Sequence, residues 1–203
     1  MGTSPDVRPP RPVTLASLLL AGTAIFCALD VIVTWVAAGQ VNDGAPTFLR
    51  TMAEAAVEDA PDWVERVQGA LNYSVAVAAG AIVVFAVLAV VVRRRSTAAR
   101  VAVWVAAVLA VCLFGVGLAN SPENFSPPDG SRAVVEQAWS VLLPGWYANA
   151  RSVLITGELL TVVVASLLLV RTSAGEFYRP QVAEPGLGAF LVERQARQHP
   201  PTD

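Results

Sequence analysis

Four long apolar runs constrain the fold of this chain more than any other feature of its sequence. A helix rises 1.5 Å per residue, so about 20 residues cross the hydrocarbon core of a bilayer, and each run is close to that length. Backbone polar groups in lipid must bond within their own segment, which favours helices over strands. The runs cover residues 13–38, 71–92, 101–119 and 152–170.

The composition also indicates a membrane protein. Of the 203 residues, 55% are hydrophobic and only 15% are charged, whereas about 25% are charged in a soluble domain. We therefore expect an all-α membrane protein, an up-down bundle of four transmembrane helices. The expected boundaries are an N-terminal segment, 1–12, a transmembrane domain, 13–170, and a C-terminal tail, 171–203.

The arginines predict the orientation of the bundle. The chain has fourteen arginines and no lysine, which, with its abundance of alanine, valine and glycine, indicates a GC-rich bacterial genome. Ten arginines lie before the first run, between the second and third, or after the fourth, and four lie in the loops 39–70 and 120–151. Because arginine is enriched on the cytoplasmic side, we expect a plasma-membrane protein with both termini in the cytoplasm.

A cleaved signal peptide is the alternative interpretation of the first run. Arg8 and Arg11 would form its basic region, and Val36-Ala37-Ala38 would form a small-residue cleavage site. However, the run of about 26 residues exceeds the 7–15 apolar residues of a signal peptide. A span is therefore favoured, and a mature protein beginning at Gly39 would show the opposite.

Each outer loop is expected to contain a short amphipathic helix, followed by a proline break and the next span. Phe48, Met52 and Ala56 recur at helical spacing in the first loop, and the segment 131–142 has an apolar face in the second. The Pro-x-Trp sequences at 61–63 and 144–146 are 83 residues apart. Two interpretations remain open: an internal duplication, and the ordinary likeness of two membrane hairpins.

Two carboxylates inside the spans are the strongest functional candidates. Asp30 lies eight residues before the outer end of its run, and Glu158 lies six residues into its own run, so the two are at similar depth. A carboxylate there costs about 2.5–3.5 kcal/mol and normally faces protein or a water-filled cavity. Thr34 and Thr161 share their helix faces, and Arg151 could pair with either acid from the outer boundary.

These acids allow two interpretations. The pair could form a proton or cation site between the first and fourth spans, because two facing carboxylates in a low-dielectric site would share a proton. Alternatively, each acid could bond a neighbouring polar group and only fix the packing. A water-accessible cavity joining the acids would favour transport, whereas a dry, hydrogen-bonded pair would favour a structural role.

The sequence contains no motif for cofactor, metal, nucleic-acid or nucleophilic chemistry. P-loop, dinucleotide-binding, HExxH and GxSxG patterns are all missing, and Cys27, Cys112 and His199 form no cluster in sequence. We therefore expect a protein that is not an enzyme.

Two local patterns remain ambiguous. Arg93, Arg94 and Arg95 could attract anionic lipid or only anchor the helices. The small pair Ala76 and Gly80 could serve dimerisation or internal packing.

The second half of the chain resembles small four-span membrane proteins of unknown function from actinobacteria. The run Leu-Leu-Pro-Gly-Trp-Tyr at 142–147 and Glu176-Phe177-Tyr178-Arg179 carry this resemblance, which implies no activity or ligand.

From the residues we expect a non-enzymatic accessory or scaffold protein whose partners are the lipid bilayer and a membrane protein or a second copy. The alternative is a small transporter or channel subunit that uses Asp30 and Glu158.

Overall fold

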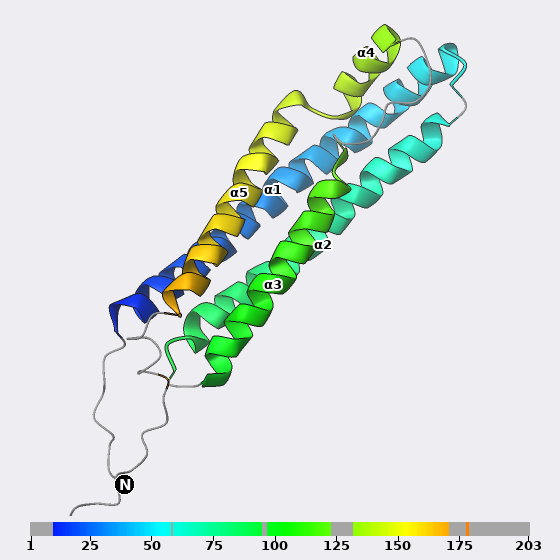
Figure 1. Ribbon diagram of the computed structural model, residues 1–203. Helices are drawn as coiled ribbons and strands as arrows, with labels where there is room; N and C mark the ends of the chain where they lie inside the picture. Colours follow the sequence, from blue (N-terminus) through cyan, green and yellow to red (C-terminus); the bar gives the residue numbers. More distant parts are fainter. Residues whose placement is uncertain (1–9, 58, 95–96, 123–131, 171–177, 179–203) are drawn as a thin grey trace, which may run out of the picture.

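The computed structural model describes residues 10–57, 59–94, 97–122, 132–170 and 178, and all regular structure among them is helical. Four of its helices are long and apolar enough to cross a membrane, which confirms, for the described residues, the prediction of an all-helical fold with four helices that could span a bilayer. The terminal segment 1–12 and the tail 171–203 lie almost wholly outside the described residues. The helices in Figure 1 are α1 (Arg11–Glu54), α2 (Ala60–Val91), α3 (Thr97–Ala119), α4 (Arg132–Leu142) and α5 (Gly145–Leu168).

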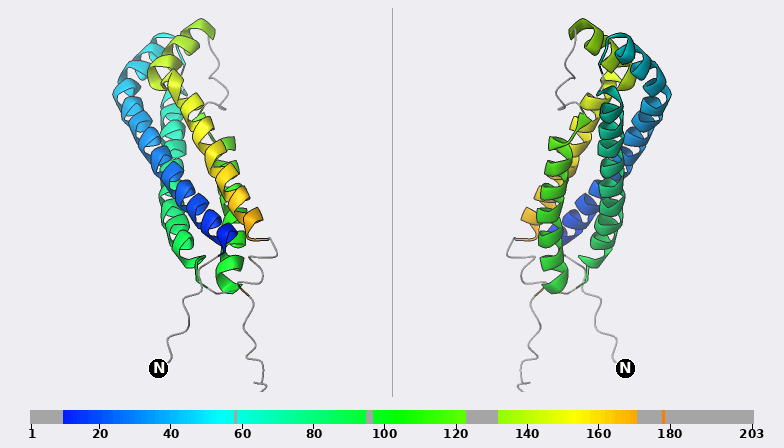
Figure 2. Two further views of the ribbon diagram at one scale, coloured as in Figure 1. Left: turned by 90° about the vertical axis from the view of Figure 1, so that its left-hand side faces the viewer. Right: turned by 90° about the vertical axis from the view of Figure 1, so that its right-hand side faces the viewer.

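The long helices α1, α2, α3 and α5 form one elongated bundle. The start of α1, the end of α5 and the link between α2 and α3 lie together at one end, which we call the terminal end (Figure 1). The opposite end, which we call the cap, contains α4 and the turn between α1 and α2. Helix α1 packs extensively against α2 and α5, whereas α3 packs less closely against α2 and α5. The side views show that α3 ends short of the cap (Figure 2).

Helix α1 is longer than the sequence predicts. The predicted span ends at residue 38 and a separate helix follows, but the structure joins both in one helix of 44 residues, about 66 Å long. The polar residues 42–44 and Pro46 would normally indicate a break, since an internal proline removes a backbone hydrogen bond. The helix continues because the apolar residues on both sides of this stretch are fully buried in the cap. Val41 precedes the polar residues, and Phe48 and Met52 follow Pro46.

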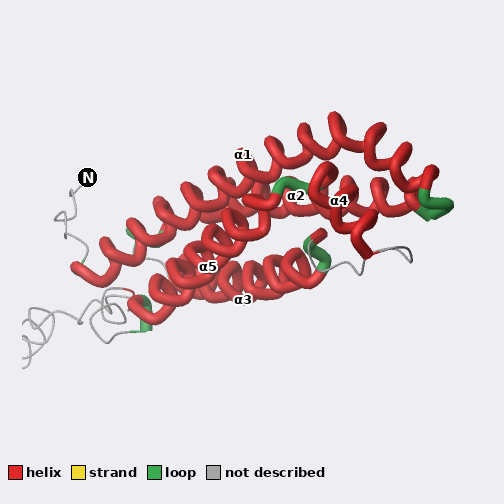
Figure 3. The backbone as a smooth tube through the Cα atoms, turned by 90° about the horizontal axis from the view of Figure 1, so that it is seen from above, coloured by secondary structure: helices red, strands yellow, loops and turns green. Residues whose placement is uncertain are grey.

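The cap has an apolar core of its own, distinct from the core of the membrane part. Phe48 of α1, Trp63 of α2 and Trp139 of α4 meet edge to face, with ring centroids 6.5 Å and 6.2 Å from Trp139. Helix α4 lies along the cap half of α1 (Figure 3). Gly44 allows this approach, because a Cβ atom there would lie 2.6 Å from the carbonyl oxygen of Val141.

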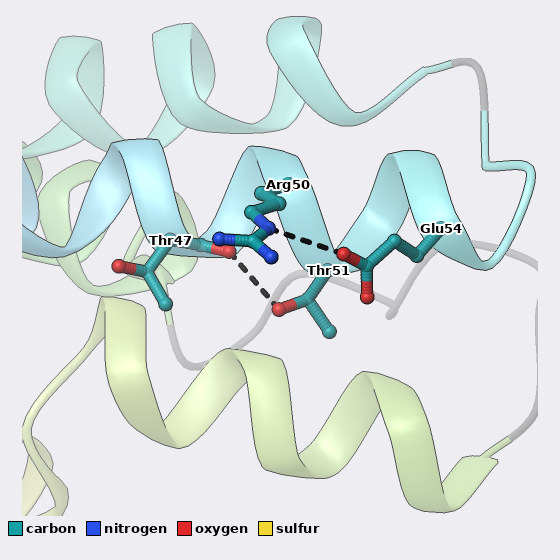
Figure 4. Close-up of polar contacts among 4 residues, drawn as sticks. All are labelled: Thr47, Arg50, Thr51 and Glu54. Atoms are coloured by element: carbon teal, nitrogen blue, oxygen red, sulfur yellow. Dashed lines mark hydrogen bonds and ion pairs between the residues drawn. The ribbon is translucent and has the colours of Figure 1, made fainter.

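The last turns of α1 carry polar contacts typical of a solvated helix surface. The Arg50 guanidinium and the Glu54 carboxylate form an exposed ion pair at 3.1 Å, and the Thr51 hydroxyl donates to the Thr47 carbonyl at 3.0 Å (Figure 4). Asn42 accepts a hydrogen bond of 2.9 Å from Gln68 of α2. The membrane part differs, because large apolar side chains such as Leu18, Ile25 and Val153 are exposed there, as expected for a surface in contact with lipid.

Candidate functional site

Three charged side chains are buried where α1 and α5 pack together. Asp30 is 5% exposed, Arg151 is 2% exposed and Glu158 is fully buried. Arg151 and Glu158 are seven residues apart, so they lie on the same face of α5, two turns from each other. We call these three residues the charged cluster.

Arg151 connects α5 to α2 and α3. Its Nη1 atom donates to the Ser121 hydroxyl at 2.8 Å, and its Nη2 atom donates to the Ser74 hydroxyl at 2.6 Å. A longer contact of 3.5 Å joins Nη2 to the carbonyl of Gly117. The Ser74 hydroxyl in turn donates to the carbonyl of Ala70 at 2.9 Å, so it accepts from the arginine while its own proton is satisfied. One side chain thus joins three helices near the cap.

The ring of Tyr147 adds a further contact to Arg151. The guanidinium carbon lies 5.8 Å from the ring centroid, which is the range of a cation–π interaction. Tyr147 is itself fully buried in the cap core. The charged cluster and the cap are therefore packed against each other through α5.

Asp30 lies beside the guanidinium without forming a direct ion pair with it. The two side chains line the same cavity, which has a volume of about 10 Å³, no more than the space that a single water molecule needs. Among the described residues the Asp30 Oδ1 atom has no hydrogen-bond partner, and the fully buried Thr34 hydroxyl lies close by without reaching hydrogen-bond geometry. The cluster is compact and nearly dry.

Glu158 is the most enclosed member of the cluster. No hydrogen bond of standard geometry reaches either of its carboxylate oxygens within the described part of the chain; the Cys27 thiol lies close to the carboxylate, and Asp30 and Arg151 are its charged neighbours. Helices α1 and α5 approach closely here, since a Cβ atom at Gly157 would lie 3.1 Å from the ring of Phe26. Such a buried, unsatisfied carboxylate requires a physical explanation.

The two threonines chosen from the sequence have different surroundings. Thr34 lies next to Asp30, as its spacing indicates. The Thr161 hydroxyl lies 2.8 Å from the Thr23 hydroxyl of α1 and also donates to the backbone carbonyls of Gly157 and Glu158, so it bonds the main chain of Glu158 and not its carboxylate. Sequence reasoning missed Ser74 and Ser121 as partners of Arg151. A serine inside an apolar span was the only local signal for Ser74.

The charges of the cluster do not balance. Two carboxylates and one guanidinium carry a net charge of −1 when all three are ionised, and an uncompensated buried charge is costly. A cavity of about 10 Å³ has no room for a hydrated cation, and the described residues contain no group of three metal-ligating side chains. Burial of one unmatched negative charge therefore favours a state in which one of the two acids keeps its proton.

No protein-family model, no curated protein and no solved structure matches this chain. The geometry of the cap and of the charged cluster is therefore the basis for assigning a function.

Proposed function

We propose that this protein is a non-enzymatic accessory or scaffold protein of the bacterial plasma membrane that acts by binding another protein through its cap. The observation that supports this proposal most is that α1 and α2 are much longer than the bilayer is thick, so that their ends form a folded cap beyond it. Helix α1 is about 66 Å long and α2 about 48 Å long, whereas the hydrocarbon core is about 30 Å thick. Conduction or packing within the membrane requires no such extension.

The cap offers a defined surface to a partner because its core is rigidly packed. Phe48, Met52 and Leu142 are fully buried in it, and the aromatic contacts between α1, α2 and α4 hold its helices together. Its exposed surface is mainly acidic: Asp43, Glu54, Asp59, Asp62 and Glu65 are exposed there, against Arg50 and Arg66. A partner with a basic surface would complement this charge.

In the proposed topology the four long helices cross the plasma membrane as an up-down bundle, with the cap outside the cell. The support is the excess of arginines in the terminal segments and in the α2–α3 link, where Arg93 and Arg94 are exposed. In this orientation the basic end of the bundle faces the cytoplasm and the acidic cap faces outward. Labelling of cysteines introduced at the two ends of the bundle in intact cells would test this orientation.

Site-specific photo-crosslinking tests the accessory role. A photoreactive amino acid replaces Glu65, which is exposed on the cap, or Val153, which is 70% exposed on the membrane face of α5. In native membranes the probe at position 65 should give a discrete protein adduct that the variant Asp62→Lys weakens, while the control at position 153 should react with lipid. A protein adduct at 153 and none at 65 would contradict a partner at the cap.

A second function, a proton site in the charged cluster, is favoured by the burial of two carboxylates, those of Asp30 and Glu158, beside a single guanidinium, that of Arg151. A membrane-embedded acid in such a position is a common element of proton pathways. Purified protein in vesicles with an internal pH dye should then pass protons faster than protein-free vesicles, and Glu158→Gln should abolish the difference. Flux equal to that of empty vesicles would rule out this function.

A further inference from the structure

A large apolar groove lies between the second half of α2 and most of the length of α3. Its volume is about 850 Å³, whereas the charged cluster encloses only about 10 Å³. Small side chains create this space on both walls, with Ala76, Gly80 and Ala81 on α2 and with Ala102 and Ala106 on α3. We call this space the α2–α3 groove.

The α2–α3 groove runs from the terminal end of the bundle past the depth of one membrane leaflet. On α2 it extends from Ala76 to Leu88 and on α3 from Ala98 to Phe114, which corresponds to about 18 Å and about 24 Å of helix. One leaflet of hydrocarbon is about 15 Å deep. Because the groove begins beside the α2–α3 link, it spans the leaflet at the terminal end of the bundle.

The volume of the groove matches lipid chains better than a protein helix. A methylene group takes about the space of a water molecule, for which about 10–15 Å³ of such volume suffices, so the groove has room for the methylenes of two acyl chains. A transmembrane helix 30 Å long and 10 Å wide occupies roughly 2,400 Å³, nearly three times as much. A helix of a second copy could therefore only lie across the opening of the groove.

The terminal end of the groove is positively charged. The link that joins its two walls contains Arg93 and Arg94, both exposed. The Arg93 Nε atom donates to the Ser17 hydroxyl at 2.8 Å, and this hydroxyl donates to the carbonyl of Ala89 at 2.6 Å. The link is thereby held against α1 and α2 at the terminal end of the bundle.

We propose that the α2–α3 groove is a binding site for one anionic phospholipid, whose acyl chains fill the groove and whose phosphate lies against the arginines of the link. The apolar walls bind the chains, and the guanidinium groups distinguish an anionic headgroup from a zwitterionic one. Basic residues at the headgroup level beside a gap between helices are a recurrent arrangement for such lipids. The site is independent of the partner at the cap and of the charged cluster.

Native mass spectrometry of the full-length protein in detergent tests this site with phosphatidylglycerol, phosphatidylcholine and inorganic phosphate. One phosphatidylglycerol should remain bound per chain, and phosphatidylcholine should bind more weakly. Arg94→Gln should reduce the affinity for phosphatidylglycerol about fivefold and leave that for phosphatidylcholine unchanged. The matched control is Arg11→Gln, which removes an exposed arginine from the same end of the bundle outside the groove.

Gly80→Leu tests the groove itself. A Cβ atom meets nothing within 4 Å at Gly80 or at Gly22 of α1, so Gly22→Leu is a matched control with the same change in size outside the groove. The Gly80 variant should reduce the binding of both lipids at least tenfold, and the Gly22 variant should not.

Equal binding of the two lipids together with no effect of Arg94→Gln would overturn the proposal. Displacement of phosphatidylglycerol by inorganic phosphate would also overturn it, because the site would then recognise the anion alone. If Gly80→Leu instead converts a dimer into a monomer and leaves lipid binding intact, the groove belongs to an interface with a second copy.

Discussion

Replacement of Arg151 is the sharpest test of the charged cluster. We expect Arg151→Met to destabilise the bundle strongly, because methionine preserves much of the apolar length of the side chain and removes its charge and donors. Asp30 and Glu158 would then share a buried site without a cation, and Ser74 and Ser121 would lose their donor. The double variant Arg151→Met with Asp30→Asn removes one charge of each sign and should be more stable than Arg151→Met alone.

The magnitude follows from the contacts of the guanidinium. Each of its two short hydrogen bonds, at 2.8 Å and 2.6 Å, is worth about 1.5–3 kcal/mol for a charged donor, and the contact of 3.5 Å adds little. Removing one partner of a buried charge pair costs about 3–5 kcal/mol. Polar groups also find partners in the membrane-inserted unfolded state, so we expect a loss of about 3 kcal/mol, about half of it recovered in the double variant.

Cys27 provides the assay. It is fully buried, whereas Cys112 is exposed. In a Cys112→Ser background a thiol-reactive fluorogenic dye therefore reports the exposure of Cys27 as the bundle unfolds on heating or in denaturant. The midpoint should fall for Arg151→Met and return part of the way when Asp30→Asn is added. Arg66→Met is a matched control, since it removes an exposed arginine from the cap.

Two results would refute this reasoning. If Arg151→Met unfolds at the same midpoint as the parent protein, the guanidinium contributes nothing to the packing of the three helices. If the double variant is less stable than Arg151→Met by the full effect of Asp30→Asn alone, the two substitutions are additive. Asp30 and Arg151 would then be energetically independent despite lining one cavity.

Three further substitutions have defined outcomes. Gly44→Ala should destabilise the cap by about 1–3 kcal/mol, seen as faster amide exchange in α4, because the new Cβ would meet the Val141 carbonyl at 2.6 Å. Ala56→Gly should raise the free energy of unfolding by about 0.5–1 kcal/mol, seen as a higher thermal midpoint, since Ala56 has φ 56°. Burial raises the pKa of the Tyr178 phenol from 10.0 to about 12. Its contribution to stability is therefore complete below pH 10.0 and is lost as the pH rises through about 12. Tyr178→Phe, which also lacks the bond to the Val92 carbonyl, should make the free energy of unfolding less dependent on pH over that range.

The spans could be predicted from the sequence because membrane insertion is decided by local composition. Each apolar run must satisfy its backbone internally and cover about 30 Å of hydrocarbon, so length and hydropathy suffice. The end of α1 could not be predicted in this way. Residues 42–44 and Pro46 contain the usual signals for a break, and the helix continues through them because Phe48 and Met52 are buried in the cap by α2 and α4, which local sequence does not encode.

The charged cluster was predictable only in part, for a similar reason. A carboxylate in a span must face protein, which placed Asp30 and Glu158 inside the bundle, and the spacing of seven placed Arg151 on the face of Glu158. The acceptors of Arg151 depend on the tertiary arrangement. Ser74 is 77 residues from Arg151 in sequence and Ser121 is 30 residues away, and no periodicity connects such pairs. The absence of a direct ion pair likewise depends on how the helices pack.

Helix α3 connects the charged cluster with the α2–α3 groove. Near the cap it is held through the contacts of Arg151 with Ser121 and Gly117, and at the terminal end the Thr97 hydroxyl donates to the carbonyl of Tyr178 at 3.2 Å. Between these points its packing against α2 is interrupted by the groove. Movement of α3 away from α5 would therefore require the least loss of apolar contact, and it would separate Arg151 from two of its three acceptors. If the cluster exchanges protons with water, α3 is therefore the long helix whose displacement would open it at the least cost in packing.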